Sequence, residues 1–362
     1  MSALRLLLVT DAVGGVWVYS LELARALKPL GVEAVLAVMG PSPSEAQRAE
    51  AADFRLIDTG LPLEWLEADP AQMRRAGQTL AELARREDVD LVQTSSAALL
   101  ADAHFHVPTV AVQHSCVASW WAAVKSGPLP SDFQWRRELV ETGLRRADAV
   151  VAPTAAFAAE TARFYGVDVL PVHNGRRIPI TDLPQGDFVL TAGRLWDEGK
   201  NAATLDLAAA GLDVPFQAVG AEQGPNGVRI HLKHMQTIGE IDQRRLSGLL
   251  AARPIYASAA LYEPFGLSVL EAAGAGCALV LSDIPTHREL WDGAALFAPA
   301  RDAQAFAAHI ASLMADREDR NRLGDLARER AQLYSLERMA GRMARLYSRL
   351  LEASPADVAS AA

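Results

Sequence analysis

The chain has 362 residues, of which 50% are hydrophobic and 22% are charged, and its formal net charge is -9. This composition is that of a globular protein and excludes a disordered chain, while the length favours two domains over one. The acidic balance argues against an extended nucleic-acid surface, because such a surface needs a basic stripe.

Two features bear on where the protein works. Cys116 and Cys277 are the only cysteines. Two thiols make neither a disulfide framework nor a zinc set, so we expect a cytoplasmic protein. No apolar stretch has the length of a membrane span, and the apolar run at the start is too short for a signal peptide. We therefore expect no transmembrane segment, while a peripheral contact with a membrane stays open.

Along the first half of the chain, short apolar runs alternate with segments of helical period. This alternation predicts a parallel β-sheet with helices on both faces. A helix should begin near Gly15 and pack its apolar face on the sheet, and the residues of this face are Val18, Leu21, Leu23, Leu27 and Leu30. The expected strands are residues 4–10, 33–39, 54–58, 90–93, 109–113, 149–152 and 167–171.

The pattern then restarts. Residues 173–187, HNGRRIPITDLPQGD, have little apolar period and are typical of a linker. A second strand series follows at residues 188–192, 216–219, 228–232, 254–257 and 278–281. The sequence thus predicts two α/β halves, followed by a helix from Leu336 whose apolar face carries Met339, Met343 and Leu346.

Ligands of open α/β sheets bind beyond the carboxyl ends of the strands. After the first strand, Gly14 and Gly15 open a helix whose backbone N–H groups can approach an anion. The pair is not part of a G-x-G-x-x-G motif, so a dinucleotide site is disfavoured. A plain tight turn accounts for the two glycines equally well.

The loop TAGRLWDEGKN follows the first strand of the second half. It places Arg194 and Lys200 at the mouth of the expected sheet. An arginine fork and a lysine point charge suit a phosphate or diphosphate. The alternative is that both are solvated loop cations, because most such cations bind nothing in particular.

A later loop, SAALYEPFG, places Glu263 before a helix that contains Glu271. The free N–H groups at the start of that helix form an anion site. Glu271 would accept hydrogen bonds from sugar hydroxyls, and Glu263 would face the ligand from the other end. Helix capping is the alternative, and it accounts for one of the two glutamates only.

Together these loops describe a site for a sugar joined to a diphosphate. The segment EPFGLSVLEA is similar to the glutamate motif of glycosyltransferase family 4, retaining enzymes of the GT-B fold that use nucleotide-sugar donors. Further segments resemble the family in the same order, namely VTDAVGGVWVYSLELARAL, AVQHS, VAPTAAF, VHNGRR and TAGRLWDEGKN. One departure is visible, because the family commonly spaces its arginine and lysine by five residues and continues with glycine. Here the spacing is six and Asn201 follows.

The resemblance implies an α/β protein of GT-B fold, with two Rossmann-like domains facing a central cleft. Residues 1–178 would form the acceptor domain and residues 179–335 the donor domain. Residues 336–362 would form a helix that returns to the N-terminal domain, and a tail. The implied activity is metal-independent transfer of a sugar, a hexose in the first instance, with retention of configuration.

The resemblance also assigns roles to single residues. Glu263 would contact the transferred sugar together with the backbone at Phe265, Gly266 and Leu267. His114 would lie near the reacting carbon, and Glu271 would bind the ribose. Arg194, Lys200 and Gly15 would bind the donor phosphates.

The acceptor has no clear signature: a saccharide, a lipid-linked molecule and a small molecule all stay open. Trp120, Trp121 and Lys125 follow His114 and are the candidate acceptor residues. The two adjacent tryptophans either stack on an acceptor or belong to the core. Asp88 and Asp90 imitate an Asp-x-Asp metal motif, but they precede a strand and so lie at the wrong end of the sheet. We expect no metal and no cofactor, with the nucleotide diphosphate sugar as donor substrate.

Other classes of function also fit parts of this pattern. A glycosidase would show two carboxylates without a diphosphate clamp. A nucleotide-sugar epimerase of GT-B fold would convert the donor without an acceptor, and a non-catalytic sugar-nucleotide binding protein would not turn over. Binding of nucleotide sugars separates the first class from the others, and turnover separates the last two.

Overall fold

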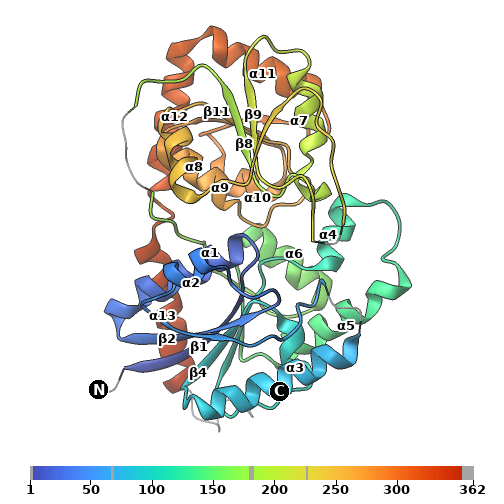
Figure 1. The fold of residues 1–362 in the computed structure, drawn as a ribbon, viewed down its shortest axis with the longest axis vertical. Helices are drawn as coiled ribbons and strands as arrows, with labels where there is room; N and C mark the ends of the chain where they lie inside the picture. The colour runs from blue at the N-terminus through green and yellow to red at the C-terminus, as the bar shows by residue number, and fades with distance from the viewer. Residues whose placement is uncertain (1–2, 67–68, 179–182, 226, 353–362) are drawn as a thin grey trace. The chain divides into compact units, whose positions relative to one another are not determined.

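The computed structural model describes residues 3–66, 69–178, 183–225 and 227–352 (Figure 1). Contacts divide the chain into two compact units. Unit 1 contains residues 1–122, 126–175 and 336–362, and unit 2 contains residues 123–125 and 176–335. Part of the expected linker (179–182) and most of the expected tail (353–362) lie outside the described residues.

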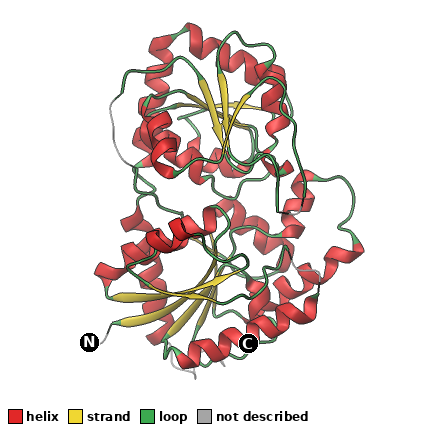
Figure 2. Cartoon of the chain, viewed as in Figure 1, coloured by secondary structure: helices red, strands yellow, loops and turns green. Residues whose placement is uncertain are grey.

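Unit 1 is built on a parallel sheet of seven strands (Figure 2). Its strands are β1 (Leu4–Asp11), β2 (Val32–Met39), β3 (Arg55–Asp58), β4 (Leu91–Thr94), β5 (Thr109–Val112), β6 (Ala149–Ala152) and β7 (Leu170–Pro171), in the order β3-β2-β1-β4-β5-β6-β7. In the register, Leu6 of β1 lies opposite Ala34 of β2 and Leu91 of β4. The strands are near-continuous apolar runs because both faces of the sheet are covered.

Helices cover the two faces of this sheet and form two separate cores. Leu6 and Leu8 point to the face covered by α1 and α13, while Leu7 and Val9 point to the face covered by α3 and α5. The helical elements are α1 (Gly15–Leu27), η1 (Lys28–Leu30), α2 (Glu45–Glu50), α3 (Pro70–Arg86), η2 (Ala97–Leu100), α4 (Val117–Val124), α5 (Ser131–Arg146), α6 (Ala155–Tyr165) and α13 (Leu336–Glu352).

The last helix, α13, packs beside α1 in unit 1 (Figure 1). The four apolar residues expected on its face, Leu336, Met339, Met343 and Leu346, are all buried. Tyr347 also donates a hydrogen bond to Gln93 Oε1 at 2.5 Å. The expected return of the final helix to the first domain is therefore confirmed. One expectation for α1 is wrong: Leu30 lies in η1 beyond the helix, and it is exposed because the chain turns at Gly31.

Unit 2 repeats the design with a six-stranded parallel sheet. Its strands are β8 (Val189–Ala192), β9 (Phe216–Val219), β10 (Gln236–Gly239), β11 (Ile255–Ser258), β12 (Ala278–Ser282) and β13 (Leu296–Ala298), in the order β10-β9-β8-β11-β12-β13. Its helical elements are η3 (Glu198–Lys200), α7 (Ala202–Ala209), α8 (Gln243–Ala251), α9 (Leu267–Ala275), α10 (Pro285–Trp291), α11 (Ala303–Ala315) and α12 (Arg317–Ala331). The expected fold class, two parallel-sheet Rossmann-like domains, is confirmed.

The strand expected at residues 228–232 is wrong, since the third strand of this series is β10. The Asp206 carboxylate accepts hydrogen bonds from the backbone N–H groups of Lys233, His234 and Met235, at 2.8 to 3.1 Å. These bonds hold the chain just before β10, so pairing with β9 begins at Gln236. The alternating residues before it, including the exposed Val228, lie in a loop.

In each sheet the strand order reverses beside the first strand. The reversal lies between β1 and β4 in unit 1 and between β8 and β11 in unit 2. Connections leave on opposite faces there, so the loops after the strands separate and leave room for a ligand. The loops that carry Arg194 and Glu263 are those that follow β8 and β11.

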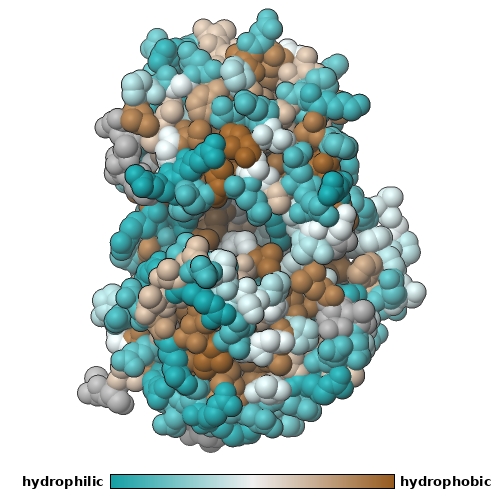
Figure 3. All heavy atoms as spheres, viewed as in Figure 1, coloured by the Kyte–Doolittle hydropathy of each residue, from teal (hydrophilic) through white to brown (hydrophobic). Residues whose placement is uncertain are grey.

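Hydrophilic residues cover much of the viewed face, where apolar side chains appear in separate patches (Figure 3). Within the described ranges, no helix is both long and apolar enough to cross a membrane.

Candidate active site

A small pocket in unit 2 lies at the reversal of the strand order. It is lined by side chains and backbone from the loops after β8 and β11 and from the start of α9. The lining residues are Thr191, Ala192, Gly193, Leu195, Lys200, Ala202, Ser258, Glu263 and Ser268. The structure thus brings together two residues that the sequence analysis selected from distant loops, Lys200 and Glu263.

Two glycines let the strand-end loops approach one another beside this pocket. Gly220 follows β9 with a φ of 134°, and a Cβ atom placed on it would lie 1.7 Å from the carbonyl oxygen of Gly193. Gly193 N donates to Val219 O at 3.0 Å, which closes the contact. No side chain fits at Gly220, so the close approach of these two loops depends on glycine there.

Arg194 lies in the chain between two pocket-lining residues, Gly193 and Leu195, and its side chain is 45% exposed. It pairs with Asp197, with Nη2 and Oδ2 2.9 Å apart. The other carboxylate oxygen of Asp197 accepts from Gly199 N at 2.9 Å and caps η3. Asp197 therefore orients the arginine and shapes the turn that presents Lys200. Asp197 was not among the residues selected from the sequence, although an aspartate before Glu-Gly-Lys is a helix-capping signal.

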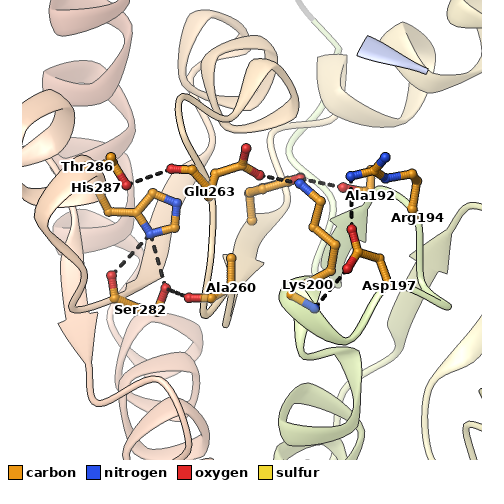
Figure 4. Close-up of polar contacts among 11 residues, drawn as sticks. Ala192, Arg194, Asp197, Lys200, Ala260, Glu263, Ser282, Thr286 and His287 are labelled. Atoms are coloured by element: carbon orange, nitrogen blue, oxygen red, sulfur yellow. Dashed lines mark hydrogen bonds and ion pairs between the residues drawn. The ribbon is translucent and has the colours of Figure 1, made fainter. Parts of the chain in front are cut away.

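Lys200 Nζ donates a hydrogen bond to Glu263 Oε2, and the two side chains point toward each other (Figure 4). The pair is mostly buried, with 24% of the lysine side chain and 11% of the glutamate side chain exposed. Burial by itself raises the pKa of Glu263, but the charge and hydrogen bond of Lys200 outweigh it, so the pKa lies below its ordinary value. Glu263 is thus an anion held between a cation and the apolar core.

Asn201 stands where the family that the sequence resembles commonly has glycine, and its backbone takes a conformation that glycine favours. Asn201 has a φ of 53°, in the left-handed region that glycine favours and that asparagine tolerates. Its side chain donates to Ala259 O at 3.0 Å and to Ala300 O at 2.7 Å. Asparagine therefore makes the turn after Lys200 and also ties it to two neighbouring loops.

The start of α9 offers backbone donors, as expected. Gly266 has a φ of 86° and precedes Leu267, the first residue of the helix. The first N–H groups of a helix have no acceptor within it. Phe265 is buried and packs edge to face on Tyr334 at 5.9 Å between ring centroids. Its side chain belongs to the core, so only its backbone is available to a ligand.

Glu271 lies further along α9 and is not among the residues that line the pocket. It forms a buried ion pair with Arg176, with Nε and Oε1 2.5 Å apart. Arg176 was not among the residues selected from the sequence. Nothing in the local sequence pairs two residues that are 95 positions apart, so the tertiary fold alone brings them together.

A third group near the pocket, His287 of α10, was also missed. Its ring lies beside Glu263, and its neighbour Thr286 donates to Glu263 O at 2.6 Å (Figure 4). His287 Nδ1 lies 3.1 Å from the carbonyl oxygen of Ser282, which can only accept, so Nδ1 carries the proton. Burial lowers the pKa of His287 to about 4. Nε2 is therefore an unprotonated acceptor, and it has no partner among the described residues.

In unit 1, the selected residues lie in the loops after β1 and β5. Gly14, with a φ of 79°, precedes Gly15 at the start of α1. His114 follows β5 and meets the Tyr19 ring edge to face, with centroids 4.4 Å apart. Burial lowers the pKa of His114 to about 4, and its Nε2 has no hydrogen-bond partner in the described part of the chain.

The residues expected near an acceptor lie on or just after α4. Trp121 is half-buried and packs against Phe133, with ring centroids 6.0 Å apart. Its Nε1 is a buried donor with no acceptor among the residues that the structure describes. Trp120 lies beside it at 6.5 Å. Lys125 belongs to unit 2, where its Nζ lies 2.5 Å from Glu198 Oε2.

The structure bears on metal binding in two ways. Asp90 directly precedes β4, and its carboxylate accepts from Arg5 N at 2.8 Å. Asp88 and Asp90 therefore lie at the amino end of the sheet, away from the strand-end loops. Within the described ranges, no three His, Cys, Asp or Glu side chains gather as a metal ion would require.

Two family models match the chain, Glycosyltransferase Family 4 over residues 13–176 and Glycosyl transferases group 1 over residues 230–330. A D-inositol 3-phosphate glycosyltransferase of Xylanimonas cellulosilytica is 26% identical, covering 96% of this chain and 94% of the relative. A phosphatidyl-myo-inositol mannosyltransferase of Mycolicibacterium smegmatis is 28% identical over about half of each chain (50% and 52%).

Solved structures of glycosyltransferases share the fold. Sucrose-phosphate synthase of Thermosynechococcus elongatus has a TM-score of 0.79 at 20% identity, covering 97% of this chain and 100% of its own. Anabaena HepE in complex with UDP-glucose has a TM-score of 0.73 at 19% identity, with 95% and 99% covered.

Proposed function

The chain belongs to glycosyltransferase family 4, and we propose that it transfers a sugar from a nucleotide diphosphate sugar to an acceptor hydroxyl, with retention of configuration and without a metal ion. The observation that carries the proposal is the pocket between the ends of β8 and β11, where Lys200, Glu263 and the start of α9 meet. Cations, backbone donors and a carboxylate are the groups that a sugar diphosphate requires.

We assign the donor diphosphate to the positive side of this pocket. Breaking the bond between the sugar and the diphosphate leaves negative charge on the leaving group, so fixed positive charge lowers the barrier most there. Lys200, the Arg194 guanidinium and the start of α9 supply such charge. We assign Gly15 to the donor phosphates from unit 1, on the resemblance to the family.

We assign the transferred sugar to Glu263 and to the backbone at Phe265, Gly266 and Leu267. Glu263 is an ionised acceptor in a mostly buried position, so its hydrogen bonds to sugar hydroxyls are charge-assisted. His114 is assigned near the reacting carbon. Its low pKa keeps the ring neutral, so it can form a hydrogen bond with the transferred sugar but cannot stabilise negative charge as a cation would. Glu271 is assigned to the ribose.

The chemical step is a front-face substitution. The bond between the anomeric carbon and the phosphate oxygen breaks, and the acceptor oxygen bonds to that carbon on the same face. The acceptor proton passes to the leaving phosphate. The protein's contribution in this mechanism is to position the donor and to neutralise the diphosphate.

We assign the acceptor to the loops of unit 1 around α4. Trp121 and Trp120 offer aromatic surface and an unused indole N–H, which suit a saccharide or another polyhydroxyl molecule. The acceptor role of Lys125 is a separate proposal, because its ammonium group already pairs with Glu198. Cys116 and Cys277 are both buried and are not joined in a disulfide, which fits a reducing cytoplasm.

Thermal shift with a panel of UDP-, GDP- and ADP-sugars tests the donor proposal, because a ligand of the folded state raises the melting temperature. The donor that binds is then offered to acceptors. myo-Inositol 3-phosphate and phosphatidylinositol come first, since the names of two relatives refer to them. Product in the presence of EDTA and retention at the anomeric carbon support the proposal. Failure of every nucleotide sugar to bind would contradict it.

A further inference from the structure

The Arg176–Glu271 pair connects the beginning of unit 2 to the interior of α9. Arg176 is the first residue of the long segment of unit 2, and its backbone N–H donates to Tyr334 O, near the end of that segment, at 3.2 Å. Both side chains are at most one-tenth exposed, with values of 7% for Arg176 and 10% for Glu271. The arginine is thus fixed by its backbone as well as by its side chain.

Each of the two buried charges, on Arg176 and on Glu271, is stabilised by the opposite charge of the other. A carboxylate removed from water is stable only with an opposite charge or several hydrogen bonds, and removal of one partner of a buried pair is strongly destabilising. An arginine keeps its proton at any pH the protein meets. Arg176 therefore supplies a permanent counter-charge to Glu271.

The geometry leaves one carboxylate oxygen for another donor. Arg176 Nε bonds to Oε1, while Oε2 of Glu271 has no hydrogen bond within the described residues. The arginine restrains the carboxylate through Oε1, and Oε2 is the oxygen that remains for another donor. A carboxylate arranged in this way binds one hydroxyl group well, because the order it requires is already present in the free protein.

We propose that Arg176 is a positioning residue, which holds Glu271 through Oε1 so that Oε2 accepts one ribose hydroxyl of the donor. Because of this hydrogen bond, the site should bind ribonucleotides more tightly than nucleotides that lack that hydroxyl. This proposal rests on the assignment of Glu271 to the ribose under the proposed function. The role of Arg176 in holding Glu271 is what goes beyond that assignment.

The test is isothermal titration of the full chain with UDP, GDP and ADP and with their 2′-deoxy and 3′-deoxy forms. A charge-assisted hydrogen bond predicts that one deoxy form of the preferred nucleotide binds about 10- to 100-fold more weakly to the wild type. We expect Arg176→Gln to reduce this ratio to less than about 3-fold, as Glu271→Gln does, and the double variant to reduce it no further.

Arg320→Gln serves as the matched control. Arg320 is also a buried arginine of unit 2 and pairs with Asp187 at 3.0 Å. Its loss should lower the melting temperature and leave the ribose preference unchanged. If Arg176→Gln is too unstable to assay, Arg176→Lys replaces it with the same expectation, because it keeps the charge and loses the fixed guanidinium geometry.

The outcomes separate the two proposals. The positioning role would be overturned if Arg176→Gln kept the wild-type ratio of affinities for the ribo and deoxy forms. It would also be overturned if Arg176→Gln bound the nucleotide more tightly than the wild type, because the arginine would then compete with the ribose for Glu271. Equal binding of ribo and deoxy forms by the wild type overturns it as well, while the nucleotide donor stands. If no nucleotide binds the wild type, the proposed function itself fails.

Discussion

The two units share a fold and differ in how their strand-end residues are satisfied. In unit 2 the selected charged groups are already paired, Lys200 and Glu263 with each other and Glu271 with Arg176. In unit 1 they are uncharged, and His114 Nε2 and Trp121 Nε1 are buried without partners among the described residues. We assign the charged diphosphate to unit 2, where buried charges are stable only when they are paired. We assign the acceptor to unit 1, where single donors and acceptors remain for its hydroxyl groups.

Glycines at the strand ends of the two units also differ in packing. Substitution of one of them should give the largest loss of stability among these predictions. In Gly220→Ala the Cβ would meet the Gly193 carbonyl oxygen at 1.7 Å in a rigid loop, so we expect a loss of about 4 kcal/mol or more in the free energy of unfolding. Gly14→Ala in unit 1 meets no atom within 4 Å and should cost only the backbone strain, about 1–2 kcal/mol. Urea denaturation compares the two, and similar losses would contradict the contrast.

The buried histidine beside Glu263 predicts a pH dependence of stability. His287 has a pKa of about 4 in the folded chain and an ordinary value of 6.5 when unfolded. The unfolded chain therefore binds the proton first as the pH falls, and about 3 kcal/mol of stability is lost between pH 6.5 and 4. His287→Asn keeps a donor for Ser282 O and cannot be protonated, so its stability should vary less over this range.

Denaturation at several pH values measures this effect. His106→Asn, at an exposed histidine of unit 1, is the control and should retain the wild-type slope. An unchanged slope in His287→Asn would show that this ring does not carry the pH dependence.

Substitution of Glu263 and substitution of Glu271 should change the kinetics in different ways. Glu263→Gln removes charge-assisted contacts at the reacting sugar and should lower kcat on the order of 100-fold. Glu271→Gln removes a contact to the ribose that exists equally before and during the reaction, so the donor KM should rise about 10-fold with a smaller change in kcat. Steady-state kinetics with saturating acceptor decide this. If Glu263→Gln affects only donor KM, its assignment to the reacting sugar fails.

The smallest effect is expected in unit 1. Trp121→Phe keeps an aromatic ring and removes the unpartnered indole N–H, so the acceptor KM should rise roughly 5-fold, the value of about one neutral hydrogen bond. The donor KM should not change. Trp196→Phe, at the cation–π partner of Arg194 in unit 2, is the matched control and should leave the acceptor KM unchanged. A change in donor preference in Trp121→Phe would contradict the division of roles between the units.

The sequence by itself determined the elements and their layers. Apolar runs and helical periods fixed the parallel sheets, because a strand covered on both faces must be apolar throughout. The face of α13 was visible because apolar residues recur there at helical spacing. Glu263, Lys200 and Arg194 were selected because they lie in loops that follow strands, where ligands of such sheets bind. The run at residues 228–232 failed because alternation cannot report a distant carboxylate, Asp206, that binds the chain ahead of β10.

Only the tertiary structure decided which groups meet. Glu263 and Lys200 are 63 positions apart and Glu271 and Arg176 are 95 apart, so no local pattern reports either pair. His287 could not be selected from the sequence either. Its role depends on its burial beside Glu263, and that burial depends on how the loops after β11 and β12 pack. Sequence periodicity reflects the distribution of apolar surface, whereas pairing of buried charges depends on strand order and on the loops that the order brings together.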